Sequence, residues 1–307
     1  MNTDLKKVVA TLRKCEVLRV TKLSHSSMNH VFKVETDREV IVARVFAKKD
    51  FPDCKKLLWI EKKLHENRID TPRILYCTNG QKPFRYGFML IEYIEGVSGW
   101  NAIREGKILL EDYFVRLGKM LRRIHGIKLT SSAFFKATHP IGQYQWFKRV
   151  VEDLALKMDL PYDIIIHIED FVIQTLTLFS PRFKNVLCHC DVGPQNQIYT
   201  PDGNIILFDW DLAEVGTLFR DLSVILMDKK EMGHLGRVED VSASIQGAFL
   251  RGYGKTGFTA EEMQRIVDAH HVISLVYNTL AYVESGKNHV QEKKNIAMML
   301  KILTKYP

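Results

Sequence analysis

The sequence predicts an α+β protein with a small, mainly antiparallel β-sheet lobe followed by a larger, mainly helical lobe. Apolar, β-branched stretches separated by turn residues dominate the first third of the chain. Long apolar patterns with helical spacing take over after Gly96. We therefore expect two lobes, residues 1–94 and residues 95–307, joined by a connector near residues 92–96. A chain of 307 residues is long enough for both.

The first lobe is expected to begin with strands, because its apolar segments are rich in β-branched residues and are broken by a turn at residues 36–38. A helix follows, with an apolar face that repeats at Leu57, Ile60 and Leu64, and Pro72 lies just beyond its end. The Asn79-Gly80 pair then marks a turn. The expected elements are strands within 17–46, chiefly at 31–34 and 40–46, a helix at 53–67, and strands at 73–77 and 88–94.

The second lobe is expected to be mainly helical, because its apolar residues recur at helical spacing over long stretches. Thr259 and Glu262 form a predicted capping box before one such stripe, on which His270 lies as an ordinary core histidine. Residues 201–204 indicate the turn of a hairpin. The expected helices are 109–125, 143–158, 163–179, 239–252, 260–284 and 289–305, and the short strands between them are 186–190, 196–199 and 205–208.

The net charge of +8 lies entirely in the first lobe. Residues 1–94 carry 19 Lys and Arg against 11 Asp and Glu, whereas residues 95–307 carry 25 of each. A lobe that binds a triphosphate explains this excess as well as a nucleic-acid surface does. Because the chain has no arginine-rich tail and no basic run interleaved with aromatic residues, we expect no nucleic-acid partner.

The five cysteines are odd in number and scattered, which does not indicate a disulfide framework. Cys188 and Cys190 flank His189, so a zinc site must be considered. In a strand the two cysteines would face one way, and His189 and Asp191 the other, which argues against a single metal held by all four. No apolar run approaches the length that spans a bilayer, and we expect a cytoplasmic protein without a membrane partner.

The strongest functional signal is the run His189-Cys-Asp-Val-Gly-Pro-Gln-Asn196, followed 13 residues later by Asp209. Phosphoryl transfer needs a carboxylate near the attacking hydroxyl and oxygen ligands for the metal ion that bridges the phosphates. A loop at the end of one strand can present Asp191 and Asn196 together. A hairpin can then bring Asp209 beside them, so three oxygen-bearing groups converge from segments close in sequence.

This pattern, His-x-Asp-x-x-x-x-Asn followed by two apolar residues and Asp, resembles the aminoglycoside phosphotransferase and choline kinase family. The likeness extends to residues 115–125, to Arg220-Asp221-Leu222 and to residues 249–253, and it covers about residues 20–285. The resemblance implies a two-lobed, protein-kinase-like fold. It also implies a Mg²⁺-requiring kinase that transfers a phosphoryl group from ATP, with GTP as the alternative donor, to a hydroxyl of a small molecule.

The resemblance assigns roles to the residues of this motif. It implies that Asp191 is the catalytic base and that Asn196 and Asp209 are magnesium ligands. Asp221 would be a structural acid that supports the catalytic loop, and His189 would orient this loop without reacting.

The resemblance also implies a nucleotide site in the first lobe. Ser27 and Asn29 lie where the fold has its phosphate loop, between two strands, although the segment contains no glycine. Arg44 takes the position of the lysine that pairs with the α- and β-phosphates. A guanidinium group stays charged and offers a fork of donors that suits phosphate.

Three further residues complete the expected nucleotide site. Glu61 is the candidate partner of Arg44, because it is the only glutamate between residues 53 and 64. The resemblance to the family's connector implies that Glu92 offers its carbonyl, and Ile94 its N–H, to the adenine edge.

The resemblance places the acceptor between the catalytic loop and the helices late in the chain. Candidate contacts are Asp211, Glu214, Asp268 and His271. Aminoglycosides are polycations, and their pockets are typically acidic. These acids do not identify the acceptor, because several of them belong to ordinary helix surfaces. The resemblance suggests first an aminoglycoside-type antibiotic kinase, with a role in antibiotic resistance, whose acceptor is expected to contact mainly residues after 205.

Two alternatives stay open. A metabolic kinase for choline, a sugar or an amino alcohol would carry the same motifs. A pseudokinase or binding module would use the scaffold only to bind, and intact Asp191, Asn196 and Asp209 weigh against it. Asp211 is either an acceptor contact, a second metal ligand or an exposed acid of the turn. The sequence does not indicate an oligomeric state.

Overall fold

The computed structural model describes residues 1–25, 29–80, 82–129, 140–227, 238–286 and 289–306. The chain divides into two compact units. Unit 1 comprises Met1–Leu109 and Asp191–Ala213, and unit 2 comprises Leu110–Cys190 and Glu214–Pro307. These units are not the expected lobes, because unit 1 continues past residue 94 and takes in the segment that carries Asn196 and Asp209. A lobe boundary at residue 94 stays a prediction.

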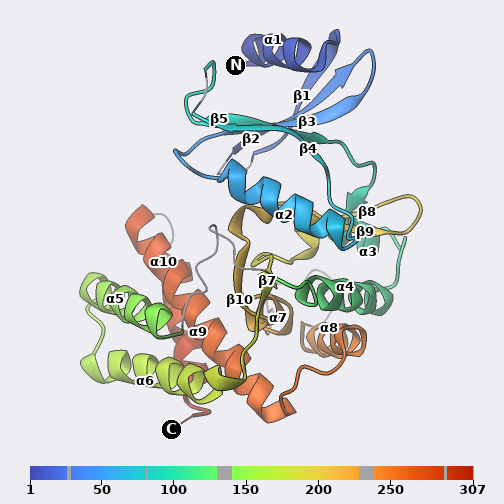
Figure 1. Ribbon diagram of the computed structural model, residues 1–307. Helices are drawn as coiled ribbons and strands as arrows, with labels where there is room; N and C mark the ends of the chain where they lie inside the picture. Colours follow the sequence, from blue (N-terminus) through green and yellow to red (C-terminus); the bar gives the residue numbers. More distant parts are fainter. Residues whose placement is uncertain (26–28, 81, 130–139, 228–237, 287–288, 307) are drawn as a thin grey trace. The chain divides into compact units, whose positions relative to one another are not determined.

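Unit 1 is built on a five-stranded antiparallel sheet with the strand order β1-β2-β3-β5-β4 (Figure 1). A second sheet joins three short strands in the order β6-β8-β9. The elements of unit 1 are α1 (Asn2–Arg13), β1 (Val17–His25), β2 (Asn29–Thr36), β3 (Val40–Phe46), α2 (Cys54–Glu66), β4 (Ile74–Asn79), β5 (Gly87–Glu92), β6 (Val97–Ser98), α3 (Gly99–Arg104), β8 (Gln197–Tyr199) and β9 (Ile205–Leu207).

The alternation of side chains along β3 divides them between the two faces of the large sheet. Ile41, Ala43 and Val45 share a buried core with Leu5 and Val9 of α1, a helix that the sequence analysis did not predict. Arg44 lies between two of these core residues in sequence and therefore points to the opposite face. The same alternation that places Ile41, Ala43 and Val45 in the core therefore places the Arg44 side chain on the other face, where the candidate site described below lies.

The hairpin of β8 and β9 has the predicted turn. Thr200 N donates to Asn204 O over 3.0 Å, and Gly203 N donates to Thr200 O over 2.9 Å. β6 pairs with β8, which brings the chain after the connector against this hairpin. Gly96 makes the approach possible, because at its φ of 155° a Cβ atom would lie only 2.5 Å from Tyr199 O.

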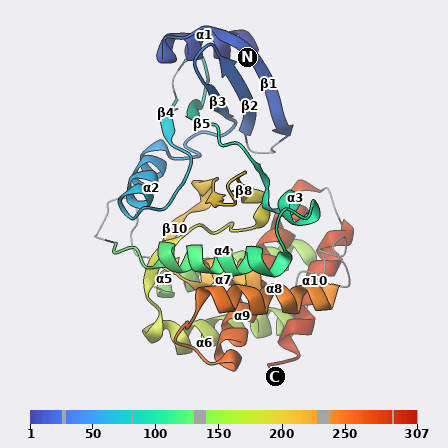
Figure 2. The ribbon, with the colours of Figure 1, turned by 90° about the vertical axis from the view of Figure 1, so that its right-hand side faces the viewer.

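The described residues of unit 2 are mainly helical, with two short strands, β7 and β10, that pair antiparallel. Helices α4 and α8 lie side by side (Figure 2). Two glycines allow this close packing: a Cβ at Gly118 would lie 2.3 Å from Phe249 O, and one at Gly252 would lie 2.0 Å from Val115 O. The elements of unit 2 are α4 (Leu110–His125), α5 (Pro140–Met158), α6 (Tyr162–Phe179), β7 (Asn185–Cys188), β10 (Glu214–Thr217), α7 (Phe219–Leu226), α8 (Val238–Tyr253), α9 (Ala260–Ser285) and α10 (His289–Leu303).

The predicted capping box of α9 is confirmed. Thr259 Oγ1 accepts from Glu262 N over 3.2 Å, and Glu262 Oε2 accepts from Thr259 N over 2.8 Å.

In the described part of the chain, one segment, residues 162–182, is apolar and long enough to cross a membrane by length and composition alone. Phe171 and Val172 of this segment are buried in the core of unit 2, and 39% of its apolar window is buried.

The structure joins Cys54 and Cys77 in a disulfide, although the cysteine pattern did not indicate one. The two residues are 23 positions apart, and their Cα atoms lie 5.5 Å from each other. The pairing was hidden in the sequence because it depends on β4 lying against the start of α2. Cys15, Cys188 and Cys190 are free thiols.

Candidate active site

Asp191 and Asn196 meet within one loop of unit 1. Asn196 Nδ2 donates to Asp191 Oδ2 over 2.7 Å and to the main-chain oxygen of Asp191 over 3.1 Å. Gln195 Nε2 donates to Asp191 Oδ1 over 3.3 Å. The loop is compact because Pro194 opens a single 3₁₀ turn, which Asn196 N closes by donating to Gly193 O over 2.9 Å. Each Asp191 carboxylate oxygen is therefore held by an amide.

Asp209 lies two residues after the end of β9, the strand that pairs with β8 directly after this loop. Phe208 N donates to Asn196 O over 3.1 Å, so the residue before Asp209 is tied directly to Asn196. Asp209 has a φ of 66°, in the left-handed region that few residues other than glycine adopt. Its Oδ1 is buried and accepts no hydrogen bond within the described residues. A buried carboxylate oxygen in this state is suited to a cation.

Arg44 is buried and holds Asp211 through both ends of its guanidinium fork. Nη1 donates to Asp211 Oδ1 over 3.2 Å, and Nη2 donates to Asp211 Oδ2 over 2.6 Å. Nη2 also lies 3.3 Å from Asp209 Oδ1. Burial by itself would lower the pKa of Arg44, but the charges of Asp211 and Asp209 outweigh it and raise the pKa. The arginine therefore stays positively charged beside the two carboxylates.

The structure shows Arg44 in contact with Asp211 and Asp209, and its expected pairing with Glu61 stays a prediction. Glu61 Oε1 accepts a hydrogen bond from Ile74 N over 2.9 Å, which fixes the start of β4 against α2. Glu61 still lines the same small cavity as Arg44, Asp209 and Asp211. Sequence reasoning could not find the Arg44–Asp211 pair, because the two residues are 167 positions apart.

The other nucleotide candidates are placed only in part. Ser27 lies outside the described residues. Asn29 is buried at the start of β2, opposite Phe46 of β3. Glu92 ends β5, and its N–H donates to Arg73 O over 2.9 Å. Ile94 follows in the extended connector and is half-buried. The roles of these four residues stay predictions.

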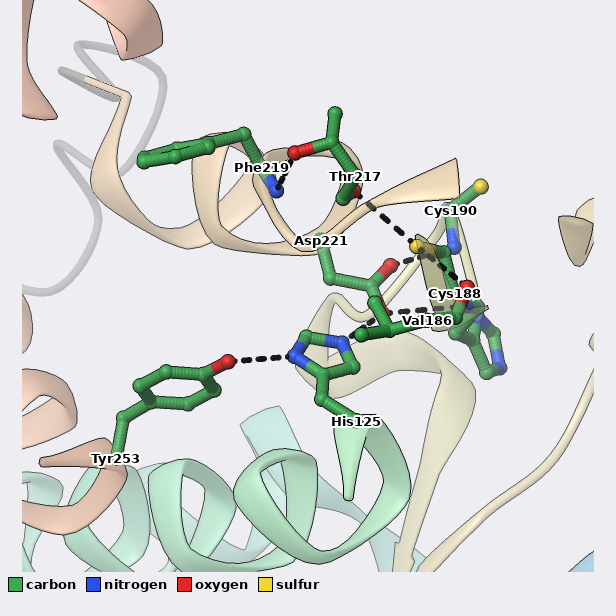
Figure 3. Close-up of polar contacts among 9 residues, drawn as sticks. His125, Val186, Cys188, Cys190, Thr217, Phe219, Asp221 and Tyr253 are labelled. Carbon is green, nitrogen blue, oxygen red and sulfur yellow. Dashed lines mark hydrogen bonds and ion pairs between the residues drawn. The ribbon is translucent and has the colours of Figure 1, made fainter. Parts of the chain in front are cut away.

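Asp221 forms a buried buttress beneath the two residues that precede Asp191 in the chain (Figure 3). Its carboxylate accepts from His189 N over 2.9 Å and from Cys190 N over 2.6 Å. His125 Nε2 lies 3.0 Å from the same carboxylate, and its Nδ1 lies 2.8 Å from Tyr253 Oη. Burial would raise the pKa of Asp221, but these partners stabilise the anion and lower it. The acid that the resemblance placed here thus contacts the backbone before the loop.

His125, Cys188 and Asp221 also bring three potential metal-ligating atoms within 4.8 Å of one another. Each atom already has a hydrogen-bond partner: His125 and Asp221 bond each other, and the Cys188 thiol donates to Thr217 O over 3.3 Å. A metal ion would have to displace these bonds. The cluster is therefore a hydrogen-bonded network in this structure.

Two of the candidate acceptor contacts, Asp211 and Glu214, are already neutralised. Asp211 is paired with Arg44 in unit 1, as described above. In unit 2, Glu214 Oε1 lies 2.7 Å from Arg220 Nε, and both side chains are about one-third exposed. The sequence analysis did not single out Arg220 as a partner, because six residues and a strand end separate the two.

The remaining two acceptor candidates line one hollow of about 410 Å³ in unit 2. Asp268 is buried there and has three partners: Lys305 Nζ at 3.0 Å, Tyr306 Oη at 2.9 Å and Gln264 Nε2 at 3.0 Å. His271, one turn further along α9, is half-buried. Asp268 is therefore neutralised within its own unit, like the other two acids.

His270 is confirmed as a core histidine and gives a pH-dependent prediction. It stacks on Phe219, and burial lowers its pKa to about 3. The unfolded chain binds a proton at this residue below about pH 6.5, whereas the folded chain does not until about pH 3. The free energy of unfolding is therefore expected to fall on acidification from pH 6.5, by on the order of 1 kcal/mol per pH unit.

Urea unfolding between pH 4.5 and 7.5 measures this slope. His270→Gln should flatten the slope, because an amide does not titrate. His167→Gln, which changes an exposed histidine of α6, should leave it unchanged. An equal slope in wild type and His270→Gln would contradict the assignment.

Comparisons with known proteins identify the family and the fold. The family model described as "phosphotransferase enzyme family" matches residues 19–265. The choline kinase LicA from Streptococcus pneumoniae is similar in structure with a TM-score of 0.67, at 18% identity over 98% of both chains. Spectinomycin phosphotransferase APH(9)-Ia, solved with ADP and spectinomycin, has a TM-score of 0.61 at 15% identity over 97% of this chain and 96% of its own.

An ethanolamine kinase from Plasmodium vivax has a TM-score of 0.66 at 14% identity, over 97% of this chain and 84% of its own. A search of curated protein sequences found no match. At these identities the solved structures show the fold, which is the expected protein-kinase-like fold with a β-sheet lobe and a helical lobe.

Proposed function

Because the chain belongs to the phosphotransferase enzyme family, and is thus a small-molecule kinase acting on a hydroxyl group, we propose that it uses ATP and Mg²⁺ and that its acceptor carries little positive charge. The observation that carries the proposal is that Asn196 donates to the Asp191 carboxylate and that Phe208, the residue before Asp209, is tied through its N–H to Asn196 O. The choice of ATP over GTP and a cytoplasmic location are parts of the same proposal. The ADP found with the similar spectinomycin phosphotransferase supports a nucleotide co-substrate.

The residues present fit a magnesium ion. Asp209 Oδ1 is a buried anionic oxygen that lies 3.3 Å from the Arg44 guanidinium, so it already faces one cationic group. The amide nitrogen of Asn196 is committed to Asp191, which leaves its amide oxygen as the atom that can ligate a cation. Oxygen donors of this kind are those that Mg²⁺ prefers. When bound, the ion supplies charge neutralisation at the phosphate oxygens.

Asp191 is the proposed base. The amide hydrogen bonds from Asn196 and Gln195 fix the orientation of its carboxylate, which can then accept the proton of the acceptor hydroxyl. Arg44 would bind phosphate oxygens with its charged fork. In unit 2, the Asp221 buttress holds the backbone of His189 and Cys190, the two residues that precede Asp191 in the chain.

The nature of the acceptor follows from the charges at its candidate contacts. Asp211, Glu214 and Asp268 each lie within 3.0 Å of a cationic group of the protein. A polycationic aminoglycoside would have to compete with these internal ion pairs, and two of them are held by largely buried carboxylates. This favours a metabolic kinase for a sugar or another hydroxyl compound of low charge over the antibiotic kinase that the family resemblance suggested first.

Magnesium-dependent phosphoryl transfer from ATP to a panel of sugars, polyols, choline, ethanolamine and aminoglycosides tests the proposal. We expect turnover with a low-charge acceptor whose KM changes little between 50 and 300 mM salt, since a low-charge ligand loses little to screening. Asp209→Asn should abolish turnover, whereas Asp202→Asn, an exposed acid of the same hairpin, should not.

Two outcomes would count against the proposal in different ways. Absence of magnesium-dependent transfer to every acceptor, together with absence of Mg–ATP binding, would overturn the kinase assignment. Efficient, salt-sensitive turnover of an aminoglycoside would overturn only the acceptor class.

A further inference from the structure

Lys56 on α2 reaches across unit 1 to the segment that follows Asp209. Its Nζ donates to Asp211 O over 2.6 Å and to Ala213 O over 3.1 Å. Both acceptors are main-chain oxygens, 155 and 157 positions away in sequence. A charged donor shared by two carbonyls is stronger than an ordinary amide bond. Lys56 therefore fixes the path of the chain from Asp211 to Ala213.

The same segment is held from a second direction by Arg44. The guanidinium of Arg44 binds the side chain of Asp211, whereas Lys56 binds its backbone. Asp211 is thus the point at which β3 and α2 are coupled, and Asp209 lies only two residues before it. Arg44, the proposed phosphate-binding cation, pairs with Asp211 of the 209–213 segment. Helix α2 contributes a cation, Lys56, to the same segment.

The backbone of Lys56 is held in place at the first turn of α2. Asp53 Oδ1 accepts from Lys55 N over 2.9 Å and from Lys56 N over 3.3 Å, which caps the first turn of α2. The adjacent Cys54 is bonded to Cys77, and Cys54 N donates to Asn79 Oδ1 over 3.0 Å. Because this end of α2 is fixed, the Lys56 side chain can hold the backbone of Asp211 and Ala213 in a defined position, in addition to supplying a charge.

We propose that Lys56 is a positioning residue for nucleotide binding: by holding Asp211, it sets the orientation of the Arg44 fork and the placement of the Asp209 carboxylate. The inference rests on the proposed function of this site in binding Mg–ATP. The inference predicts that replacing Lys56 raises the KM for Mg–ATP and leaves the KM for the acceptor nearly unchanged. Replacing a lysine with a solely structural role would not change one KM selectively.

The test replaces Lys56 with Met, which keeps most of the length of the side chain and removes the donor. Kd and KM for Mg–ATP are expected to rise about tenfold, the factor that corresponds to the loss of one charge-assisted hydrogen bond, while KM for the acceptor stays within about twofold. Lys56→Arg should recover most of the affinity. Lys62→Met, which changes an exposed lysine of the same helix, is the matched control.

Amide hydrogen exchange over residues 209–213 adds a readout that does not depend on catalysis. Lys56→Met should accelerate exchange in this segment and Lys62→Met should not. The wild-type protein could fail to transfer phosphate while Lys56→Met still accelerates exchange in residues 209–213. That result would overturn the kinase assignment but not the positioning role. Unchanged exchange and unchanged Mg–ATP affinity in Lys56→Met, or an equal effect of Lys62→Met, would overturn the inference.

Discussion

Asp191→Ala is expected to lower kcat for phosphoryl transfer by roughly 10²- to 10⁴-fold, the range for loss of a general base. The carboxylate is half-buried and oriented by amide donors of Asn196 and Gln195, so its replacement removes the proton acceptor together with its fixed geometry. Affinity for Mg–ATP should change little, because the proposed metal ligands are Asn196 and Asp209. Initial rates with saturating ATP, together with calorimetric titration of Mg–ATP, measure the two quantities separately.

The control for this prediction is Asp202→Ala, which removes an exposed acid from the neighbouring hairpin turn. It should retain kcat within about threefold. Near wild-type turnover in Asp191→Ala would show that the base assignment is wrong. Loss of both turnover and Mg–ATP binding would instead place Asp191 among the metal ligands.

Asp221→Ala is expected to destabilise unit 2 by roughly 3–5 kcal/mol, the cost of removing one partner from a buried charged network. The substitution leaves two backbone N–H groups, of His189 and Cys190, without their acceptor in a buried position, and it leaves His125 without its carboxylate. Because the folded pKa of Asp221 is lowered, its contribution to stability is present above its unfolded pKa of about 3.9. This contribution is lost as the pH falls through the folded value.

Urea unfolding at pH 7 measures the loss of stability. Asp170→Ala, which removes an exposed carboxylate from α6, should stay within about 0.5 kcal/mol of wild type. Asp221→Asn should lie between the two, because an amide oxygen can still accept one of the backbone bonds. A stability of Asp221→Ala equal to that of Asp170→Ala would contradict the buttress role.

The succession of elements could be predicted from the chain because its signals are local. The helices of unit 2 follow apolar spacing, and the capping box at Thr259 and Glu262 needs only four consecutive residues. The helix at residues 2–13 was missed, since just two of its apolar residues, Leu5 and Val9, are buried and lysines surround them. The short helix α7 was missed because it spans only Phe219–Leu226, too few residues to display a clear period.

By itself the sequence determined the motif residues, since Asp191, Asn196 and Asp209 lie within 19 positions of one another and a hairpin brings them together. Only the tertiary structure decided the partners of the charged groups: Arg44 with Asp211, Lys56 with the backbone of Asp211, and Cys54 with Cys77. The reason is physical. Hairpins and helices form between neighbours in sequence, whereas an ion pair across 167 positions depends on where packed elements place two side chains. The same dependence decides which acids face a substrate and which are neutralised inside the protein.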